Sequence, residues 1–419
     1  MAHARRSRAS AHGQPTVKHS CIRILCGLML AAPAWPALAG TSPALAAALE
    51  SAWQRALAAS EASGRSRIAE ARLAATASPW AAPPSIDISQ RENRLLRDTG
   101  QRETEVGVSW PLWLPGQRDA RQRAARGEVD LASASTEQLR LGLAGELREL
   151  AWAAAALRAV RDESRLQADS LDGLAADVAR RVDAGELAHA DLLAARAEAE
   201  LARAAVIDAA QQLRAVESRW QLLTGDLPLP DGADEQPGAA TDVERHPELV
   251  AAQAAIELAR RRLDAVKLDR RAPPELTVRY RHDEPGAGMP AQDSIGLGVR
   301  IPLGTADRNL ERDATALVEL DRAQVQLDRT RERIRADVAL AEQALSTAHA
   351  ALEAGRLRAA LLVERAALLD RAFRAGESGL PELLRVRAAA AQAQQGVRRQ
   401  LAMLGLARAR LNQSIGLLP

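Results

Sequence analysis

The sequence predicts a mainly α-helical protein with a small β-sheet portion, built from a duplicated helix-strand-strand-helix-helix unit. Two very long stretches have helical periodicity, and four short segments alternate apolar and polar residues. The order of these segments occurs twice along the chain. The sheet is expected to form a small membrane β-barrel portion, and the long stretches are expected to form coiled-coil helices.

Residues 1–39 are expected to be a cleaved signal peptide. They have a basic start, an apolar stretch over 24–37 and the small-x-small sequence Ala-Leu-Ala at its end. The alternative is a disordered cytosolic tail. Both cysteines, Cys21 and Cys26, lie inside this segment, and neither follows the apolar stretch as the cysteine of a lipoprotein does. We therefore expect export without a lipid anchor.

An internal duplication organises the rest of the chain. The tripeptide Ala-Gly-Glu occurs around Gly185 and around Gly376, and the offset of 191 residues between these glycines also relates 107–112 to 298–303. A period of this length indicates a duplicated domain rather than a solenoid. In chain order, the predicted parts are a first structural repeat (40–228), an inter-repeat linker (229–241) and a second structural repeat (242–419).

Each repeat is predicted to begin with a helix rich in Ala, Leu and Arg that ends near a proline. Two longer helices follow the strands in each repeat. The six predicted helices are 44–78, 117–183, 188–223, 244–271, 306–374 and 381–415. Leu320, Leu327 and Ile334 step by seven residues, which is the spacing of a coiled-coil seam. At ~1.5 Å per residue, a helix of roughly 65 residues is about 100 Å long, as a structure that bridges a wide gap requires.

Four segments are predicted to be strands with one apolar and one polar face: about 85–91, 104–110, 275–281 and 294–301. The sheet could pack on the helices with its polar face in water. Alternatively, the apolar face contacts lipid, and the polar face lines the water-filled lumen of a barrel, with Asp87, Arg279, Arg281 and Arg300 on it. An open edge cannot stand in lipid, and a barrel needs about eight strands or more. Several chains would therefore share the barrel, and we favour this interpretation.

Two further features occur in both repeats. One is a strand-to-helix passage, Gly-Val-Ser-Trp-Pro-Leu (107–112) and Gly-Val-Arg-Ile-Pro-Leu (298–303), and the other is a tip sequence between two helices, 184–193 and 375–384. With the duplication and these features, the chain resembles the TolC-like outer-membrane efflux channels. This resemblance implies a homotrimer with a trimeric α-barrel and a shared 12-stranded β-barrel. The tip 375–384 is most similar to the heavy-metal efflux, CzcC/CusC-like branch.

The resemblance also implies where such a channel lies and what it meets. It would stand in the outer membrane of a Gram-negative cell, surrounded by outer-membrane lipid, with a helical tunnel in the periplasm. Its partners would be a periplasmic adaptor and an inner-membrane efflux pump of the resistance-nodulation-division type. The implied tip and adaptor-docking residues are Gly185, Glu186, Asp191, Gly376, Glu377 and Glu382.

The tip residues also have simpler interpretations. Gly185 and Gly376 suit ordinary helix C-terminal positions with positive φ. Asp191 and Glu382 stand early in the next helix, where an acid favours the positive end of the helix dipole. A ring of these acids that attracts cations is the bolder hypothesis.

Other chemistry has little support in the sequence. With 56 basic and 54 acidic residues interspersed, no basic face for nucleic acid stands out. The histidines after residue 39 have no cysteine or close carboxylate partner, so no metal site is predicted, and no nucleophile-base pair or phosphate loop is seen. We expect no enzyme activity and no cofactor.

The predicted function is that of an exit duct that passively conducts solutes, with heavy-metal cations as candidates. Two alternatives remain open at this stage. One is a periplasmic coiled-coil scaffold or adaptor without a pore, and the other is a duct for protein secretion.

Overall fold

The computed structural model describes residues 42–92, 100–230, 235–238, 242–286 and 288–419. These residues belong to one structural unit of the chain. The expected signal peptide and part of the expected linker lie outside the described residues.

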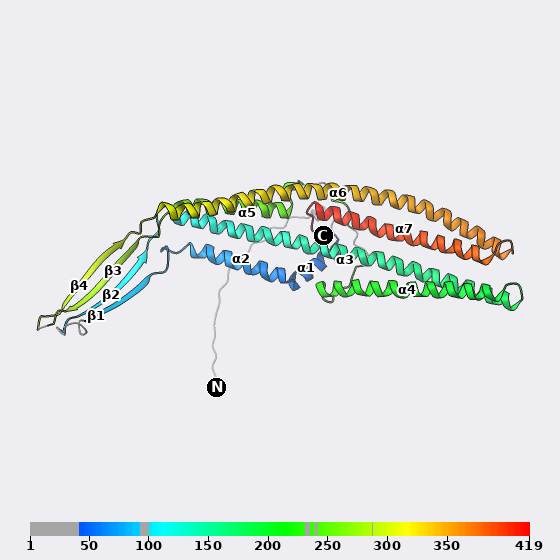
Figure 1. Cartoon of the computed structure of the whole chain (residues 1–419), viewed down its shortest axis with the longest axis horizontal. Coiled ribbons are helices and arrows are strands. Elements are labelled where there is room, and N and C mark those ends of the chain that lie inside the picture. The colour runs from blue at the N-terminus through cyan, green and yellow to red at the C-terminus, as the bar shows by residue number, and fades with distance from the viewer. Residues whose placement is uncertain (1–41, 93–99, 231–234, 239–241, 287) are drawn as a thin grey trace, which may run out of the picture. The chain divides into compact units, whose positions relative to one another are not determined.

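The first predicted helix, 44–78, is wrong as one element, because the chain forms two helices there. Helix α1 covers Pro43–Arg55 and α2 covers Leu57–Ala75, and Ala56 between them is extended, with φ −69° and ψ 133°. Helix α1 buries Leu45 and Leu49 in a cluster with α3 and α4, whereas α2 buries only alanines. The break at Ala56 lets each helix follow a different part of its neighbours (Figure 1).

The four predicted strands form one antiparallel sheet in the order β1-β2-β3-β4. Their bounds are β1 Ser85–Glu92, β2 Arg102–Pro111, β3 Glu275–Glu284 and β4 Gln292–Arg300. Strand β4 ends at Arg300, one residue before the predicted end. Pro302 follows two residues later, and it has no N–H to donate to a neighbouring strand. The central β2–β3 pair joins the two halves of the chain.

The long helices follow the predicted bounds closely. They are α3 Gln117–Asp183, α4 His189–Thr224, α6 Ala306–Arg374 and α7 Leu380–Ser414. Helix α3 has 67 residues and α6 has 69. At ~1.5 Å per residue, each helix is about 100 Å long. Helices α3 and α4 lie side by side, as do α6 and α7 (Figure 1).

Helix α5 is shorter than the predicted 244–271. It covers Pro247–Leu268 and follows the 3-10 turn η1, Val243–Arg245. His246 caps α5, because its Nδ1 accepts a hydrogen bond of 3.2 Å from the Glu248 N–H. Pro247 then occupies the first helical position, where a missing N–H costs nothing.

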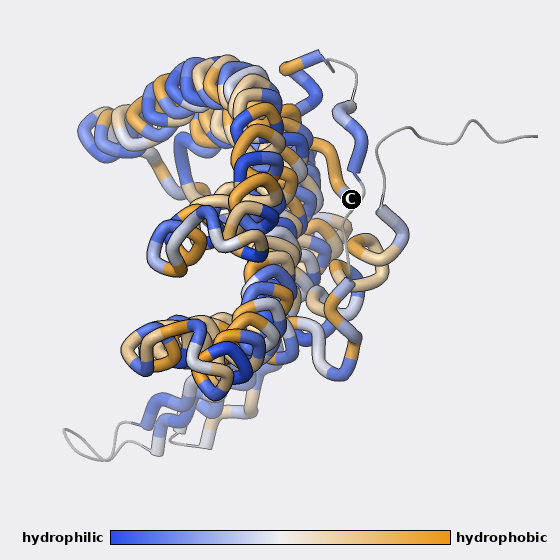
Figure 2. The backbone as a smooth tube through the Cα atoms, turned by 90° about the vertical axis from the view of Figure 1, so that its right-hand side faces the viewer, coloured by the Kyte–Doolittle hydropathy of each residue, from blue (hydrophilic) through white to orange (hydrophobic). Residues whose placement is uncertain are grey.

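The helices are held together by seams of small and branched side chains. One cluster joins α3, α4, α6 and α7 through Ala195, Ala199, Val178, Leu383 and Phe373. Alanine at these positions lets the helix axes approach closely. Figure 2 shows hydrophilic and hydrophobic residues alternating along the long helices. Among the described residues, none of the helices contains an apolar stretch long enough for a membrane span.

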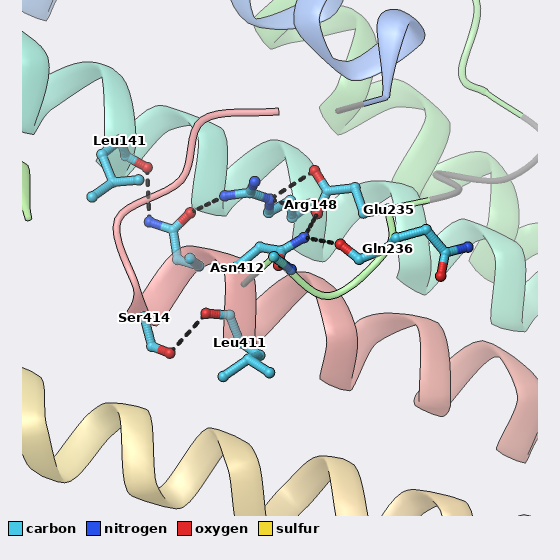
Figure 3. Close-up of polar contacts among 9 residues, drawn as sticks. Leu141, Arg148, Glu235, Gln236, Leu411, Asn412 and Ser414 are labelled. Atoms are coloured by element: carbon cyan, nitrogen blue, oxygen red, sulfur yellow. Dashed lines mark hydrogen bonds and ion pairs between the residues drawn. The ribbon is translucent and has the colours of Figure 1, made fainter. Parts of the chain in front are cut away.

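The described part of the expected linker is also a packing element. Glu235 is fully buried against Arg148 of α3, whose Nε donates to both carboxylate oxygens at 3.1 and 3.0 Å (Figure 3). Asn412 of α7 donates to the Gln236 carbonyl at 3.0 Å and accepts from the Gly238 N–H at 2.8 Å. The segment 235–238 thus connects α3 to α7.

Candidate functional site: the two-faced sheet and the helix tips

The strand register separates apolar from polar residues across all four strands. Ile86, Val108, Val278 and Leu297 form one cross-strand row, and the next apolar row contains Tyr280 and its partners. The alternate positions form the opposite face. There, Asp87, Gly107, Arg279 and Gly296 form one row. The alternation of apolar and polar residues along each strand therefore gives the whole sheet one apolar and one polar face.

The apolar face is open on the described chain. Ile295, Leu297 and Val299 of β4 are 78, 79 and 62% exposed, and Ile86 and Ile88 of β1 are also well exposed. These residues are not covered by the helices of the same chain. An exposed apolar surface of this kind marks an interaction with lipid or with another protein.

The polar face contains all four predicted lumen residues, Asp87, Arg279, Arg281 and Arg300. Arg279 Nε lies 3.3 Å from Glu105 Oε1, and Arg281 Nη2 lies 3.1 Å from Glu103 Oε2. Ser109 and Thr277 share a buried hydroxyl–hydroxyl hydrogen bond of 2.9 Å. The structure thus brings the four residues to one face and adds carboxylate partners that the sequence analysis missed.

A charged cluster connects the ends of three helices. Asp269, which follows α5, receives hydrogen bonds from Gln117 at 2.5 Å, from Arg121 at 3.0 Å and from Arg312 at 2.8 Å. Burial opposes ionisation of Asp269, but the hydrogen bonds and the positive charge around it hold its pKa below the usual range. Because its donors lie near the starts of α3 and α6, Asp269 connects both long helices to the end of α5.

The two predicted tips have the same backbone geometry. Gly185 and Gly376 have φ of 78° and 80°. At the first tip, the Gly185 N–H donates to the Val182 carbonyl at 3.0 Å and the Glu186 N–H donates to the Arg181 carbonyl at 2.8 Å. The second tip repeats both bonds. This is the Schellman arrangement, in which a left-handed residue satisfies the last carbonyls of a helix.

The acids of the tips also occupy matching positions. Asp191 and Glu382 are each the third residue of their helix, α4 and α7. The Asp191 carboxylate accepts a hydrogen bond of 3.2 Å from the Ala188 N–H. Near the tips, the guanidinium of Arg181 lies 5.0 Å above the ring of Phe373 and so joins α3 to α6. The six predicted tip residues therefore fall in or beside two equivalent turns.

The described histidines do not gather into a site. His189 begins α4, His246 caps α5 and His349 lies within α6. The expectation that no histidine has a close carboxylate partner is wrong for His282 of β3, whose Nδ1 lies 2.7 Å from Asp293 Oδ1 across the β3–β4 pair. Within the described ranges, no group of three or more His, Cys, Asp or Glu side chains is arranged to hold a metal ion.

Comparisons with known proteins agree with this arrangement. Residues 45–226 match the family described as outer membrane efflux protein. Protein CyaE of Bordetella pertussis is 29% identical over 332 residues, which cover 72% of this chain and 69% of that protein.

Three solved structures illustrate the similarity of fold. CusC, reported in a study of folding and transmembrane channel formation, has a TM-score of 0.77 at 14% identity, covering 90% of this chain and 93% of CusC. VceC of Vibrio cholerae has 0.71 at 14% identity, covering 89% and 96%. The open-state MtrE channel of Neisseria gonorrhoeae has 0.71 at 16% identity, covering 90% of each chain.

At such low identities the solved structures establish the fold alone. The sequence match covers the first repeat, and the second repeat has the same order of strands and helices. Among the solved structures with this fold, MtrE is described as an outer membrane channel. The first repeat thus matches the outer membrane efflux protein family in sequence, and the described chain has the fold of CusC, VceC and MtrE.

Proposed function

We propose that three copies of this chain form the outer-membrane exit duct of a tripartite efflux system. The duct passively conducts solutes that an inner-membrane pump and a periplasmic adaptor deliver. The observation that carries this proposal is the two-faced sheet, whose strands are followed by α3 and α6, two helices of about 100 Å.

The edges of the sheet support assembly from several chains. In the order β1-β2-β3-β4, the strands β1 and β4 each have one paired neighbour, so both outer edges are open within the described chain. Since an open edge in lipid leaves backbone groups without hydrogen bonds, copies of the chain must pair β1 with β4 of a neighbour. Three copies of four strands would close a barrel of 12 strands.

The lumen assignment follows from the same geometry. A membrane barrel turns its apolar face to lipid and its polar face to water. We place Asp87, Arg279, Arg281 and Arg300 in the lumen on this ground. The exposure of Leu297 and Ile295 on the opposite face supports this placement, because lipid would cover them.

The tips are the proposed docking surface for the adaptor. Gly185 and Gly376 end helices that extend far from the sheet, with Glu186 and Glu377 next to them. We further propose that Asp191 and Glu382 form an acidic ring that attracts cations. Neutralising both should lower the cation selectivity of the reconstituted pore, and unchanged selectivity would remove this part of the proposal.

The substrate and the pump belong to the proposal as well. The tip sequence 375–384 supports the heavy-metal efflux branch and a pump of the resistance-nodulation-division type. Deleting the gene and measuring growth on divalent metals, copper, silver, detergents and antibiotics tests this, with a complemented strain as control. Hypersensitivity confined to metals would support the heavy-metal efflux branch. Broad sensitivity to drugs and detergents would instead indicate a multidrug efflux duct.

Export through a cleaved signal peptide, without a lipid anchor, completes the proposal. Mass spectrometry of the protein purified from outer membranes should find an N-terminus at Gly40 without a lipid. An uncleaved chain or a lipid-modified cysteine would contradict it.

The pore itself is tested by fractionation and conductance. We expect the protein to stay in outer membranes during a carbonate wash, to cross-link as a trimer and to give steady conductance in planar bilayers. Release by carbonate without conductance would instead support the periplasmic scaffold. Loss of secretion of a protein after gene deletion, with solute efflux intact, would support the secretion duct.

A further inference from the structure

We propose that the arginines lining the strand part of the duct are charge-compensated by acids of the same sheet, so that these arginines do not make the passage selective for anionic solutes. This inference rests on the proposed function, in which the polar face of the sheet lines the lumen. It concerns the strands only and is independent of the acids at the tips.

The first observation is that the arginines of this face are paired with acids. Besides the Arg279–Glu105 and Arg281–Glu103 pairs, Arg91 Nη1 lies 3.3 Å from Glu103 Oε2. Arg300 Nη1 lies 3.5 Å from Glu275 Oε2. Each arginine that the structure describes on the polar face of the four strands therefore has a carboxylate partner within the sheet.

The register explains why the arginines lie along the wall. Arg279 stands opposite Gly107 on β2 and Gly296 on β4, so its direct neighbours carry no side chain. A Cβ added to Gly107 would lie 3.4 Å from Arg279 Cγ, which shows that the arginine stem passes close over this glycine. Arg279 reaches Glu105, two residues along β2, in a diagonal pair.

The acids are less exposed to solvent than the arginines with which they pair. The Glu103 side chain is 12% exposed, while that of Arg281 is 45% exposed. The row beyond Arg279 consists of Ser85, Ser109, Thr277 and Gly298, all small. The wall is thus uncharged at this row and has no bulky side chain there that would narrow the passage.

The pairing matters for the electric field more than for stability. The potential of two opposite charges about 3 Å apart falls off faster with distance than that of one charge. Solvent-exposed ion pairs contribute little to folding. Removing one partner should therefore expose a charge to passing ions while the sheet remains folded.

The test is the ion selectivity of the reconstituted pore under a KCl gradient. In Glu105→Gln, every copy presents an uncompensated Arg279 at the same level of the barrel. We expect the ratio of chloride to potassium permeability to rise about threefold near 10 mM salt and less near 1 M, where the screening length is only about 3 Å. Arg279→Gln should shift the ratio in the opposite direction, and the double variant should restore the wild-type ratio.

Glu92→Gln is the matched control. Glu92 pairs with Arg102 at 2.8 Å on the same two strands, but on the opposite face of the sheet. Its loss should leave the permeability ratio unchanged.

The outcomes separate the inference from the proposed function. The inference would be overturned, with the proposed pore function unaffected, by any of three results. The permeability ratio could stay unchanged in both single variants, the double variant could keep a shifted ratio, or Glu92→Gln could shift the ratio as much as Glu105→Gln. A wild-type protein that gives no conductance would overturn the proposed function, and the inference with it.

Discussion

Substitution of Glu235 by Gln should destabilise the protein more than any exposed charge change in the helices. The carboxylate is fully buried and accepts two hydrogen bonds from Arg148, whose side chain is 2% exposed. Neutralising one partner of a buried pair leaves the other charge buried without compensation, which costs about 3–5 kcal/mol. We expect Glu235→Gln to lose a free energy of unfolding in this range.

The assay is denaturant unfolding of the purified protein in detergent, followed by the circular dichroism of the helices. The matched control is Glu149→Gln, one residue along α3 from Arg148. Glu149 pairs with Arg410 of α7 at 2.6 Å, but both side chains are about half exposed. An exposed pair contributes about 0–1 kcal/mol.

A double variant tests whether the uncompensated charge, rather than the change in side-chain shape, causes the loss of stability. Replacing Arg148 by Met and Glu235 by Leu together removes both charges and should recover much of the loss, since apolar groups can replace a buried pair. The reasoning is refuted if Glu235→Gln is as stable as Glu149→Gln. It is also refuted if the double variant is less stable than Glu235→Gln alone.

Three further changes test individual features by thermal or denaturant unfolding. Gly376→Ala should cost about 1–2 kcal/mol, because φ is 80° there, and a wild-type stability would contradict the turn geometry. Gly405→Ala should lower stability by about 1–3 kcal/mol, because the new methyl would meet the Trp152 ring, whereas Gly396→Ala on the same helix meets open space and should not. Since the pKa of Asp269 is lowered in the fold, its stabilising contribution is complete above its ordinary value of 3.8 and is lost as pH falls through the folded pKa. A stability profile between pH 2 and about 5 should therefore be flatter for Asp269→Asn, and equal slopes would contradict the assignment.

The most accurate predictions from sequence concern features that depend on neighbouring residues alone. Helices α3 and α6 begin and end where the periodicity starts and stops. Gly185 and Gly376 end their helices with positive φ, because glycine adopts this conformation without the cost that a Cβ adds. The alternation of the strands likewise follows from a period of two.

The sequence predicted the site only in part. The common face of Asp87, Arg279 and Arg281 follows from alternation within each strand. The pairing of Arg279 with Glu105 depends on how β2 and β3 are placed against each other, and no local signal in either strand sets that diagonal contact.

By itself, the sequence determined the duplicated order of elements, the lengths of the long helices and the two faces of the strands, because periodicity and turn chemistry are local. Only the tertiary structure decided the break at Ala56, which follows from packing against other helices. The same holds for the Arg148–Glu235 pair, whose partners are 87 residues apart. Burial and long-range ion pairs depend on which surfaces meet in space, and a single sequence does not encode this in any local pattern.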